Sequence, residues 1–350
     1  MNFTYWVTED CNLRCKYCYV GKTPKTMNKE TAAKAIDFTV RTLATDLSNN
    51  KDKIRIALHG GEPLLNYPII HYLVEELKER ISGNIIFTMT TNGTIHNQDM
   101  IDYILKNIEL TVSLDGKQEN HDINRIYKNG EGSFNRVIET IDYIKTQTQS
   151  FRVRMTVTPN NVLYLADSYI YLSEKGYSNV TFALDESDTN WNKGLMEVYQ
   201  KNLNEIFSYM VNTDLSKAQY HLYNLKNEYF RPRSVCDGCH TSFHISSLGN
   251  LYPCIFAVGK EEFSMGDVFS GIVEQRLFDL DEISQKDQGI CTNCAMYNNC
   301  RSKVCKIINK IQTGNYYKSS PVFCTTQKIH YSTVKKYEYI LEDFELLLSK

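Results

Sequence analysis

Three cysteines near the start of the chain, in the run CNLRCKYC, constrain it more than any other feature. Cys11, Cys15 and Cys18 follow a β-prone apolar segment, Phe3–Thr8, and the aromatic Tyr17 stands directly before the last cysteine. Three thiolates can hold a four-iron cluster and leave its fourth iron open. The spacing therefore predicts a cofactor loop after a first strand, with an open iron at which chemistry can occur.

The cysteine count supports this interpretation. The chain has 11 cysteines, and the eight outside the first run all lie between Cys236 and Cys324. An odd number does not suit a disulfide framework. Because Met1–Asp10 is no hydrophobic signal segment, we expect a reducing, cytoplasmic location, where clustered cysteines more often bind metal than pair with each other. The count fits one cluster with three cysteine ligands and two clusters with four each.

Composition narrows the classes of function. The 350 residues have a formal net charge of −2, with 42% hydrophobic and 23% charged residues, which is typical of a soluble globular enzyme. A near-neutral charge does not favour a nucleic-acid partner. No apolar run approaches the roughly 20 residues that a membrane helix needs, so we expect no membrane partner.

Strand-like and helix-like runs alternate from residue 1 to about 215. Runs rich in β-branched or aromatic residues predict strands over Phe3–Thr8, Ile54–His59, Ile85–Thr90, Leu110–Leu114, Phe151–Thr158 and Asn179–Leu184. Amphipathic runs predict helices over Lys29–Leu47, Ile69–Ile81, Gln98–Lys106, Phe134–Thr146, Val162–Lys175 and Leu195–Val211, with Asn28 and Ser133 as N-caps. The alternation predicts an α/β fold with a parallel sheet, and six units make a partial (β/α)6 TIM-like barrel.

The pattern changes after residue 215, where the alternation stops and the cysteine density rises. We therefore predict a barrel domain over 1–215 and a small cysteine-rich domain over 216–326, held together by metal rather than by a large apolar core. Apolar residues at helical spacing predict a C-terminal packing helix over 327–350.

Glycine-rich and polar segments follow four predicted strands, on the rim where a parallel barrel places its reactive loops. The cysteine run follows the first strand, Gly60-Gly61-Glu62-Pro63 the second and Thr91–Thr94 the third, and Ser113 ends the fourth. Each segment alone is weak, because Gly-Gly and Asn-Gly are ordinary turn signals. Their convergence predicts a cofactor site on one rim.

The triad Cys11-x3-Cys15-x2-Cys18, with Tyr17, resembles the motif of the radical S-adenosylmethionine (SAM) superfamily. The resemblance implies that the three cysteines bind a [4Fe–4S] cluster and that SAM chelates its fourth iron. One electron then cleaves SAM to methionine and a 5′-deoxyadenosyl radical, which abstracts a hydrogen atom from an unactivated C–H bond. The cofactor supplies the difficult chemistry, and the protein orients it and excludes water.

Further segments are similar to the superfamily's SAM contacts. Gly60-Gly61-Glu62-Pro63 is similar to the GGEP segment, whose backbone oxygens accept from the SAM amino group, and glycine permits close backbone approach to a ligand. Ser113 and Arg125 look like contacts to the SAM carboxylate, for which an arginine fork is suited. The resemblance places Tyr17 against the adenine. Arg125 on its own is more often a surface ion pair.

The C-terminal cysteines resemble the SPASM (twitch-type) domain, a module with two auxiliary [4Fe–4S] clusters. The run Gly249–Cys254 is similar to its G-x-x-x-P-C hairpin, and the four-residue gap before Cys305 is one residue longer than usual. The family pattern implies Cys236, Cys239, Cys254 and Cys305 for the first auxiliary cluster and Cys291, Cys294, Cys300 and Cys324 for the second. Three [4Fe–4S] clusters are then expected, with zinc as the alternative because paired C-x2-C also suits zinc.

Radical SAM enzymes with this module mostly modify peptides. The sulfatase-maturing branch, which makes formylglycine, usually has an aspartate base after the cysteine that corresponds to Cys254, and this chain has Ile255 there. We therefore predict the maturation of a ribosomally made precursor peptide by a thioether, C–C or C–O crosslink. Because the first predicted strand begins at Phe3, we expect no leader-binding domain ahead of the barrel, and a separate leader-binding protein or another mode of recognition instead.

Three alternatives stay open: an atypical sulfatase-maturing enzyme, a small-molecule radical SAM enzyme, and a zinc-stabilised binding module without activity. Besides the precursor peptide, we expect an electron donor of the flavodoxin or ferredoxin type. The acidic loop Asp185-Glu186-x-Asp188 follows the sixth strand. A solvated loop is the simpler interpretation, and Asp185 as a catalytic base is the functional one. Trp191 is expected to be a packed aromatic residue.

Overall fold

The computed structural model describes residues 1–45, 53–148, 150–233 and 235–341. The chain forms two compact units, each assembled from several segments. Met1–Met155, Gly176–Ala183 and Asp237–Leu280 make the first unit, and Thr156–Lys175, Leu184–Cys236 and Asp281–Lys350 the second. The domain boundaries expected at residues 215 and 326 stay predictions, because these units interleave along the chain.

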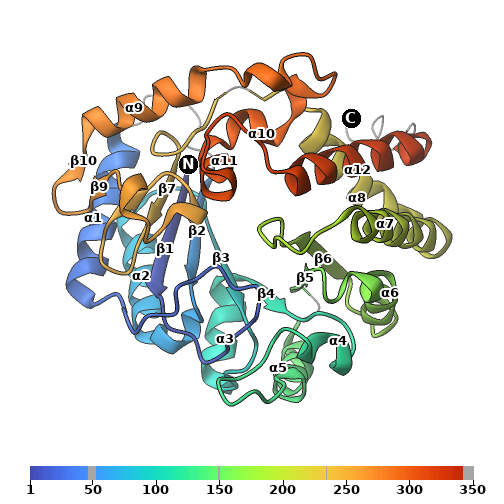
Figure 1. The fold of residues 1–350 in the computed structure, drawn as a ribbon. Helices are drawn as coiled ribbons and strands as arrows, with labels where there is room; N and C mark the ends of the chain where they lie inside the picture. Colours follow the sequence, from blue (N-terminus) through green and yellow to red (C-terminus); the bar gives the residue numbers. More distant parts are fainter. Residues whose placement is uncertain (46–52, 149, 234, 342–350) are drawn as a thin grey trace. The chain divides into compact units, whose positions relative to one another are not determined.

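An eight-stranded sheet in the order β6-β5-β4-β3-β2-β1-β7-β8 runs through the first unit (Figure 1). Parallel pairing joins β1 through β5 in sequence and also joins β7 to β1, whereas β8 is antiparallel to β7. This confirms the predicted α/β fold with a parallel sheet. The strands are β1 (Asn2–Thr8), β2 (Ile54–Gly60), β3 (Ile85–Thr91), β4 (Glu109–Ser113), β5 (Arg152–Val157), β6 (Asn179–Leu184), β7 (Ser242–Ile245) and β8 (Leu251–Tyr252).

The cysteine-rich region adds two strands that the sequence pattern did not predict. β7 and β8 have four and two residues, too short for a two-residue alternation to stand out. Because β7 pairs with β1, β1 is central and almost wholly buried, as expected for a parallel strand covered on both faces. A small antiparallel ribbon, β9 (Gly266–Asp267) with β10 (Gly271–Ile272), completes the strands within the described residues.

The first unit's helices begin where capping groups are available. Asn28 caps the first helix as predicted, because Thr31 N donates to Asn28 Oδ1 at 2.8 Å. Ser133 was expected to cap the helix that begins at Phe134, but Phe134 N instead donates to Asp122 Oδ1 at 3.0 Å. The Ser133 hydroxyl has other partners in the candidate site. These helices are α1 (Lys29–Thr45), α2 (Tyr67–Arg80), α3 (Gln98–Asn107), α4 (Gln118–Asp122) and α5 (Phe134–Gln147); the predicted continuation of α1 to Leu47 lies outside the described residues.

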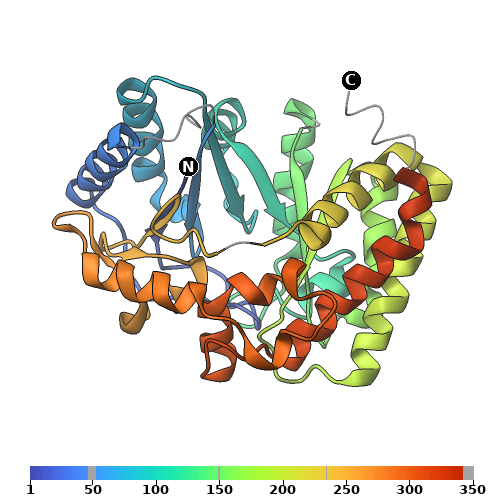
Figure 2. The same ribbon diagram turned by 90° about the horizontal axis from the view of Figure 1, so that it is seen from above.

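Helices dominate the second unit, where α7, α8 and α12 pack together (Figure 2). Hydrogen bonds join Tyr199 of α7 to His330 of α12 at 2.6 Å and Ser208 of α7 to Tyr337 of α12 at 3.2 Å. The helix α8 was not predicted. The second unit contains α6 (Leu165–Glu174), α7 (Lys193–Thr213), α8 (Leu215–Phe230), α10 (Arg301–Val304), α11 (Lys306–Thr313) and α12 (Pro321–Tyr337), and α9 (Glu274–Gln285) spans the junction of the two units.

The C-terminal helix is confirmed in part. α12 begins at Pro321, earlier than the predicted 327, because Ser320 Oγ accepts from Phe323 N at 3.1 Å and proline suits the first turn. A 3-10 turn, Glu338–Leu341, follows it, and the predicted extension over 342–350 lies outside the described residues. None of the helices in the described part of the chain is both long and apolar enough to cross a membrane.

Candidate cofactor site

The cysteine loop leaves β1 at an irregular end. The β1–β2 register shifts between Trp6 and Thr8, and Cys11 then follows, buried, with Cys15 and Cys18 half-buried. Leu13 N donates to Cys11 Sγ at 3.4 Å. Burial raises the pKa of Cys11 to about 11; the Leu13 N–H opposes this, and the charges of nearby Cys15 and Cys18 add to it. The three thiols therefore lie close enough to influence one another.

This donor set fits a [4Fe–4S] cluster held by three thiolates. A buried thiol with a raised pKa is a poor free thiolate, and binding to iron removes its proton. In the described parts of the chain, no group of three or more His, Cys, Asp or Glu side chains is arranged to hold a single metal ion. The cysteines of a cubane cluster each bind a different iron, so they stand farther apart than the ligands of one ion.

Asn92, at the end of β3, ties this loop to the sheet. Its amide nitrogen donates to Asn12 Oδ1 at 2.9 Å and lies 3.7 Å from Cys11 Sγ, and its Oδ1 accepts from Thr94 N at 2.9 Å. Asn92-Gly93 was interpreted only as a turn. The turn exists, with Gly93 at φ +74°, but the side chain also supports the sulfur. Its place on the predicted rim was the available signal.

Gly60 and Gly61 allow the loop after β2 to press against the cysteine loop. A Cβ at Gly60 would lie 2.2 Å from Thr8 O, and one at Gly61 2.1 Å from Asp10 O. Gly61 N donates to Thr8 O at 3.0 Å, and Glu62 N to Asp10 O at 2.9 Å. These glycines were expected to permit close approach of a ligand. The structure gives a different reason, close approach of the chain's own backbone.

Glu62 is fully buried, and its hydrogen bonds connect the loop after β2 to the end of β3. Its carboxylate accepts from Leu64 N at 3.1 Å, Thr91 Oγ1 at 2.8 Å and Asn92 N at 2.7 Å. Burial raises the pKa of Glu62 to about 7, and the three hydrogen bonds oppose that rise. Pro63 begins the 3-10 turn Pro63–Asn66 that Glu62 caps. The GGEP segment therefore holds the cysteine loop and β3 in a fixed relation.

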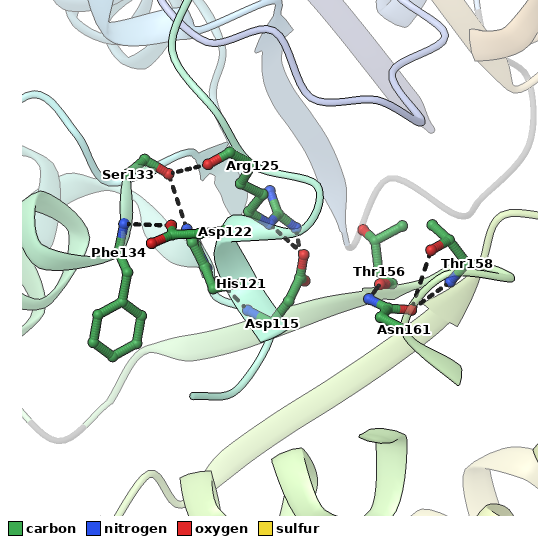
Figure 3. Close-up of polar contacts among 9 residues, drawn as sticks. All are labelled: Asp115, His121, Asp122, Arg125, Ser133, Phe134, Thr156, Thr158 and Asn161. Atoms are coloured by element: carbon green, nitrogen blue, oxygen red, sulfur yellow. Dashed lines mark hydrogen bonds and ion pairs between the residues drawn. The ribbon is translucent and has the colours of Figure 1, made fainter. Parts of the chain in front are cut away.

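Arg125 is buried, and Asp115 occupies its fork. Arg125 Nε donates to Asp115 Oδ2 at 2.7 Å and Arg125 Nη2 to Asp115 Oδ1 at 3.1 Å (Figure 3). The Tyr17 ring lies over the guanidinium, 5.3 Å from centroid to Cζ. Asp115 holds the pKa of Arg125 above its usual range against the opposing effect of burial. The simpler interpretation, in which Arg125 forms an ion pair on the surface, is therefore wrong, because both partners are buried. Asp115 was not among the predicted site residues.

His121 and Ser133 hold the Asp115–Arg125 pair in place through hydrogen bonds to its backbone. Asp115 N donates to His121 Nδ1 at 3.2 Å, so His121 Nε2 carries the proton toward Ser133 Oγ at 2.9 Å. The Ser133 hydroxyl in turn donates to Arg125 O at 2.8 Å. Burial and the Arg125 charge hold the pKa of His121 well below its usual value. Figure 3 also shows a turn of the second unit, where Thr158 N donates to Asn161 Oδ1 at 2.7 Å.

Comparisons with known proteins identify the family of this chain. Residues 6–168 match the Radical SAM superfamily. An uncharacterised protein of Methanocaldococcus jannaschii is 31% identical over 258 residues, which are 71% of this chain and 82% of that protein. The chain belongs to the radical SAM superfamily. The resemblance predicted from the cysteine motif is thus confirmed, and the protein is an enzyme that uses SAM and a [4Fe–4S] cluster.

Other similar proteins are named for their activity or their ligands. The cysteine-type anaerobic sulfatase-maturating enzyme of Clostridium novyi is 24% identical over 325 residues, 84% of this chain and 85% of that enzyme. The structure of anSMEcpe with bound AdoMet and Cp18Cys peptide has a TM-score of 0.77 at 20% identity and covers 99% of both chains. Streptococcus suis SuiB bound to precursor peptide SuiA has a TM-score of 0.61 at 16% identity, over 92% of this chain and 75% of that one. At these identities, the two structures show a shared fold.

The radical SAM rim also contains Arg154, which sequence reasoning missed. Ser113, buried at the end of β4, pairs in register with Arg154 of β5, so their side chains lie on one face of the sheet. The Arg154 charge acts on Tyr17 and Tyr19, and no ion pair to it is found among the described residues. The alternation Arg152-Val153-Arg154-Met155 was the signal, because it places both arginines on one face.

An aromatic cluster follows the cysteine loop. Tyr19 is 49% exposed and Phe256 42% exposed, and their ring centroids are 5.1 Å apart. Tyr19 OH lies 3.3 Å from His59 Nε2, while His59 Nδ1 accepts from Gly60 N at 2.7 Å. Burial lowers the pKa of His59 to about 4, so the ring is neutral at physiological pH. The pair Tyr19 and Phe256 presents an exposed aromatic surface beside Cys18 and Ile255.

The cysteines expected for the first auxiliary cluster fall into two pairs. In the first unit Cys239 is buried, and the preceding Gly238 has no room for a Cβ, which would lie 2.6 Å from Pro253 O beside Cys254. In the second unit, burial raises the pKa of Cys305 to about 11, and the charge of Cys236 adds to the rise. Since the pairs belong to different units, their assembly into one site stays a prediction.

All four cysteines expected for the second auxiliary cluster belong to the second unit. The charges of Cys324 and Cys294 act on Cys291, and those of Cys324 and Cys291 act on Cys300. Cys294 and Cys324 are exposed, and the other two are half-buried. The thiols thus influence one another across a long stretch of sequence, and this arrangement fits a common cluster.

The carboxylates of the acidic loop after β6, Asp185 and Asp188, accept hydrogen bonds from backbone groups of the same loop. Asp185 Oδ1 accepts from Ser187 N at 3.1 Å, and Asp188 Oδ1 accepts from Asn190 N at 2.8 Å. Trp191 is buried and its Nε1 donates to Asp185 O at 2.7 Å, which confirms the packed aromatic interpretation. Burial raises the pKa of Glu186 to about 7. A catalytic role for Asp185 stays a prediction.

Proposed function

We propose that this radical SAM enzyme matures a ribosomally made precursor peptide by forming a thioether, C–C or C–O crosslink. The observation that carries the proposal is Ile255, which leaves the position after Cys254 without a carboxylate base for formylglycine formation. Ile255 opens the 3-10 turn Ile255–Ala257 and is half-buried. The fold shared with two peptide-bound proteins supports a peptide substrate.

The chain's own residues would hold and orient SAM at the rim. When bound by Cys11, Cys15 and Cys18, the cluster supplies the electron that converts SAM to methionine and a 5′-deoxyadenosyl radical. The loop Gly60–Pro63 would face the SAM amino group from a position fixed by Glu62. Tyr17 would limit access of water to the adenine side. These roles follow the superfamily pattern and the geometry of the first unit.

We propose Ser113 and Arg154 as the pair that binds the SAM carboxylate. Both side chains lie on one face of the sheet, and Arg154 has no ion pair among the described residues. Arg125 was expected in this role, but its fork already holds Asp115. Arg125 then shapes the pocket through Tyr17, while a free guanidinium suits the carboxylate.

The exposed pair Tyr19 and Phe256 is proposed as a contact for the peptide. Exposed aromatic side chains bury large apolar area on binding, and they are enriched at interfaces. Both residues neighbour positions that the proposal already uses, Cys18 and Ile255. Asp185, which belongs to the second unit, is proposed separately as a base that accepts a proton from the product radical.

The proposed cofactor content is three [4Fe–4S] clusters, with an electron donor of the flavodoxin or ferredoxin type and a separate leader-binding protein as partners. An anaerobically purified chain should be brown, absorb at about 400 nm and contain about 12 iron atoms. Each cysteine set replaced by alanine should remove about four of them. A colourless chain that contains zinc instead would support the binding-module alternative.

Formylglycine formation is the second candidate, because a sulfatase-maturating relative matches over most of both chains. Two substrates separate the candidates: the precursor peptide encoded beside the gene and a cysteine-containing sulfatase peptide. With reduced enzyme and SAM, the precursor should lose two hydrogen atoms without forming an aldehyde, and the sulfatase peptide should stay unchanged. An aldehyde on the sulfatase peptide alone would show that the crosslink proposal is wrong.

The variant Ile255→Asp sharpens this test. If the missing carboxylate decides the outcome, the variant should gain aldehyde formation on the sulfatase peptide. Ile255→Asn has a similar size and no base, and serves as the matched control. Formation of 5′-deoxyadenosine in every reaction confirms that the SAM chemistry is intact. Accumulation of 5′-deoxyadenosine with neither peptide changed would direct the search to small molecules.

A further inference from the structure

Among the described residues, a buried lysine of the second unit has neither a hydrogen-bond partner nor an ion-pair partner for its charge. Lys306 begins α11, directly after Cys305, and is only 2% exposed. Its Nζ lies 5.2 Å from the centroid of the Tyr317 ring, and it makes no hydrogen bond within the described residues. Lysine is almost never fully buried without a partner, because removing an ammonium from water costs several kcal/mol.

Three charged groups act on Lys306, and two of them have the sign that would stabilise its ammonium. Burial lowers the pKa of Lys306, and the charges of Asp287 and Cys291 oppose that shift, whereas Lys303 reinforces it. Asp287 makes no ion pair with Lys306 in the described structure; its Oδ1 accepts from Tyr297 OH at 2.7 Å. Besides Asp287, the group of opposite charge that acts on Lys306 is Cys291.

Cys291 belongs to the four cysteines expected to hold the second auxiliary cluster. The charges of these thiols act on one another, and all four lie in the same unit as Lys306. A cubane cluster bound by four thiolates carries a net negative charge, and that charge increases when the cluster accepts one electron. Such a group beside Lys306 would offset the cost of burying the ammonium.

We propose that Lys306 is the buried counter-charge of the second auxiliary cluster, where its ammonium donates a hydrogen bond to a cluster or cysteine sulfur and raises the reduction potential. The inference rests on the proposed cluster content. The step concerned is the addition of one electron to the cluster, with no bond made and no proton transferred. A fixed positive charge stabilises the reduced form more than the oxidised form, because the reduced form is more negative.

The neighbouring lysines do not share this position. Lys310, one turn later on α11, donates to Gly314 O at 3.0 Å and is half-buried. Lys303 lies over the Tyr297 ring at 5.2 Å and is also half-buried. Lys310→Met is therefore a matched control: it removes the same charge from the same helix without exposing a buried site.

The test is a redox titration, followed by electron paramagnetic resonance, of a chain in which Cys11, Cys15 and Cys18 are replaced by alanine. Only the two auxiliary clusters then contribute, with about eight iron atoms in total. In Lys306→Met, one of the two transitions should shift so that the ratio of reduced to oxidised cluster falls about tenfold at a given potential, a midpoint change of about 59 mV. Lys306→Arg should restore most of the shift, and Lys310→Met should not shift either transition.

The outcomes separate this inference from the proposed cofactor content. Fewer than about eight irons in the chain that lacks Cys11, Cys15 and Cys18 would contradict the proposed cofactor content. Full iron content with both transitions unchanged in Lys306→Met would overturn the role of Lys306 alone. If Lys306→Met cannot retain the cluster, the parent chain is labelled with lysine carrying ¹⁵N at Nζ. A ¹⁵N coupling to a reduced auxiliary cluster then supports the proposal, and its absence rejects it.

Discussion

The N-terminal and C-terminal cysteine segments present their thiols in opposite ways. Around Cys11, hydrogen bonds from Leu13 N and Asn92 Nδ2 reach the sulfur, and Glu62 connects the ends of β2 and β3. We call this set of contacts the N-terminal frame. Between Cys291 and Cys324 the backbone consists of short turns and short helices, and two of the four thiols are exposed. The contrast indicates that the sheet shapes the first segment, whereas the second depends on its metal for shape.

Removal of iron tests this contrast most strongly. After chelation under anaerobic conditions, amides between Cys291 and Cys324 should exchange with deuterium as fast as in an unfolded chain. Amides of β1 and β2 should keep most of their protection, because the parallel sheet is formed without metal. Hydrogen exchange read by mass spectrometry gives both values in one experiment. Equal loss of protection in the two segments would remove the distinction.

Breaking the pair Asp115 and Arg125 tests how rigid the N-terminal frame is. Asp115→Ala leaves a buried guanidinium without its partner, and we expect the free energy of unfolding to fall by about 3–5 kcal/mol. Asp122→Ala removes a carboxylate of the same region that accepts from Phe134 N at a helix start, so its loss should be about 1 kcal/mol. Urea unfolding of the iron-free chains compares the two. Equal losses would mean that the frame does not depend on the buried pair.

Arg154 tests whether the frame also binds SAM. In Arg154→Gln, loss of one charge-assisted hydrogen bond should weaken SAM binding by about 2 kcal/mol, which is more than tenfold. Arg152→Gln is the matched control, two residues earlier on the same strand and also exposed. Equilibrium dialysis of the reconstituted enzyme measures both affinities. If Arg125→Gln weakens binding and Arg154→Gln does not, the superfamily assignment of Arg125 is the better one.

How far the sequence could predict the molecule also differs between the regions. The first strand was evident because a central parallel strand is an apolar run, and β1 begins one residue before the predicted Phe3. The pairing of Asp115 with Arg125 was not predictable, because it depends on how α4 folds back over the end of β4. In the second unit, apolar spacing predicted α6, α7 and part of α12. The helix α8 and the burial of Lys306 were not predicted, because the region around them was interpreted from its cysteine spacing. Local patterns thus predicted most of the longer helices and strands, whereas packing decided which side chains pair with one another.

Acid provides the smallest and most specific test, in the helical part of the second unit. His330 of α12 bonds Tyr199 OH at 2.6 Å, and burial lowers its pKa from 6.5 to about 3. The folded chain therefore binds fewer protons than the unfolded chain, so this stabilisation is present above pH 6.5 and is lost as the pH falls toward 3.

Between pH 7.5 and pH 5.5, the wild-type chain should lose about 1 kcal/mol more stability than His330→Gln, which cannot be protonated in this range. Comparing the two chains cancels the effects of other groups, including His221, whose pKa burial lowers to about 4. Iron-free chains are used, so that acid release of iron does not contribute. An equal loss of stability in both chains would mean that α12 opens locally and lets His330 bind a proton without global unfolding. The packing of α7 against α12 would then not be rigid.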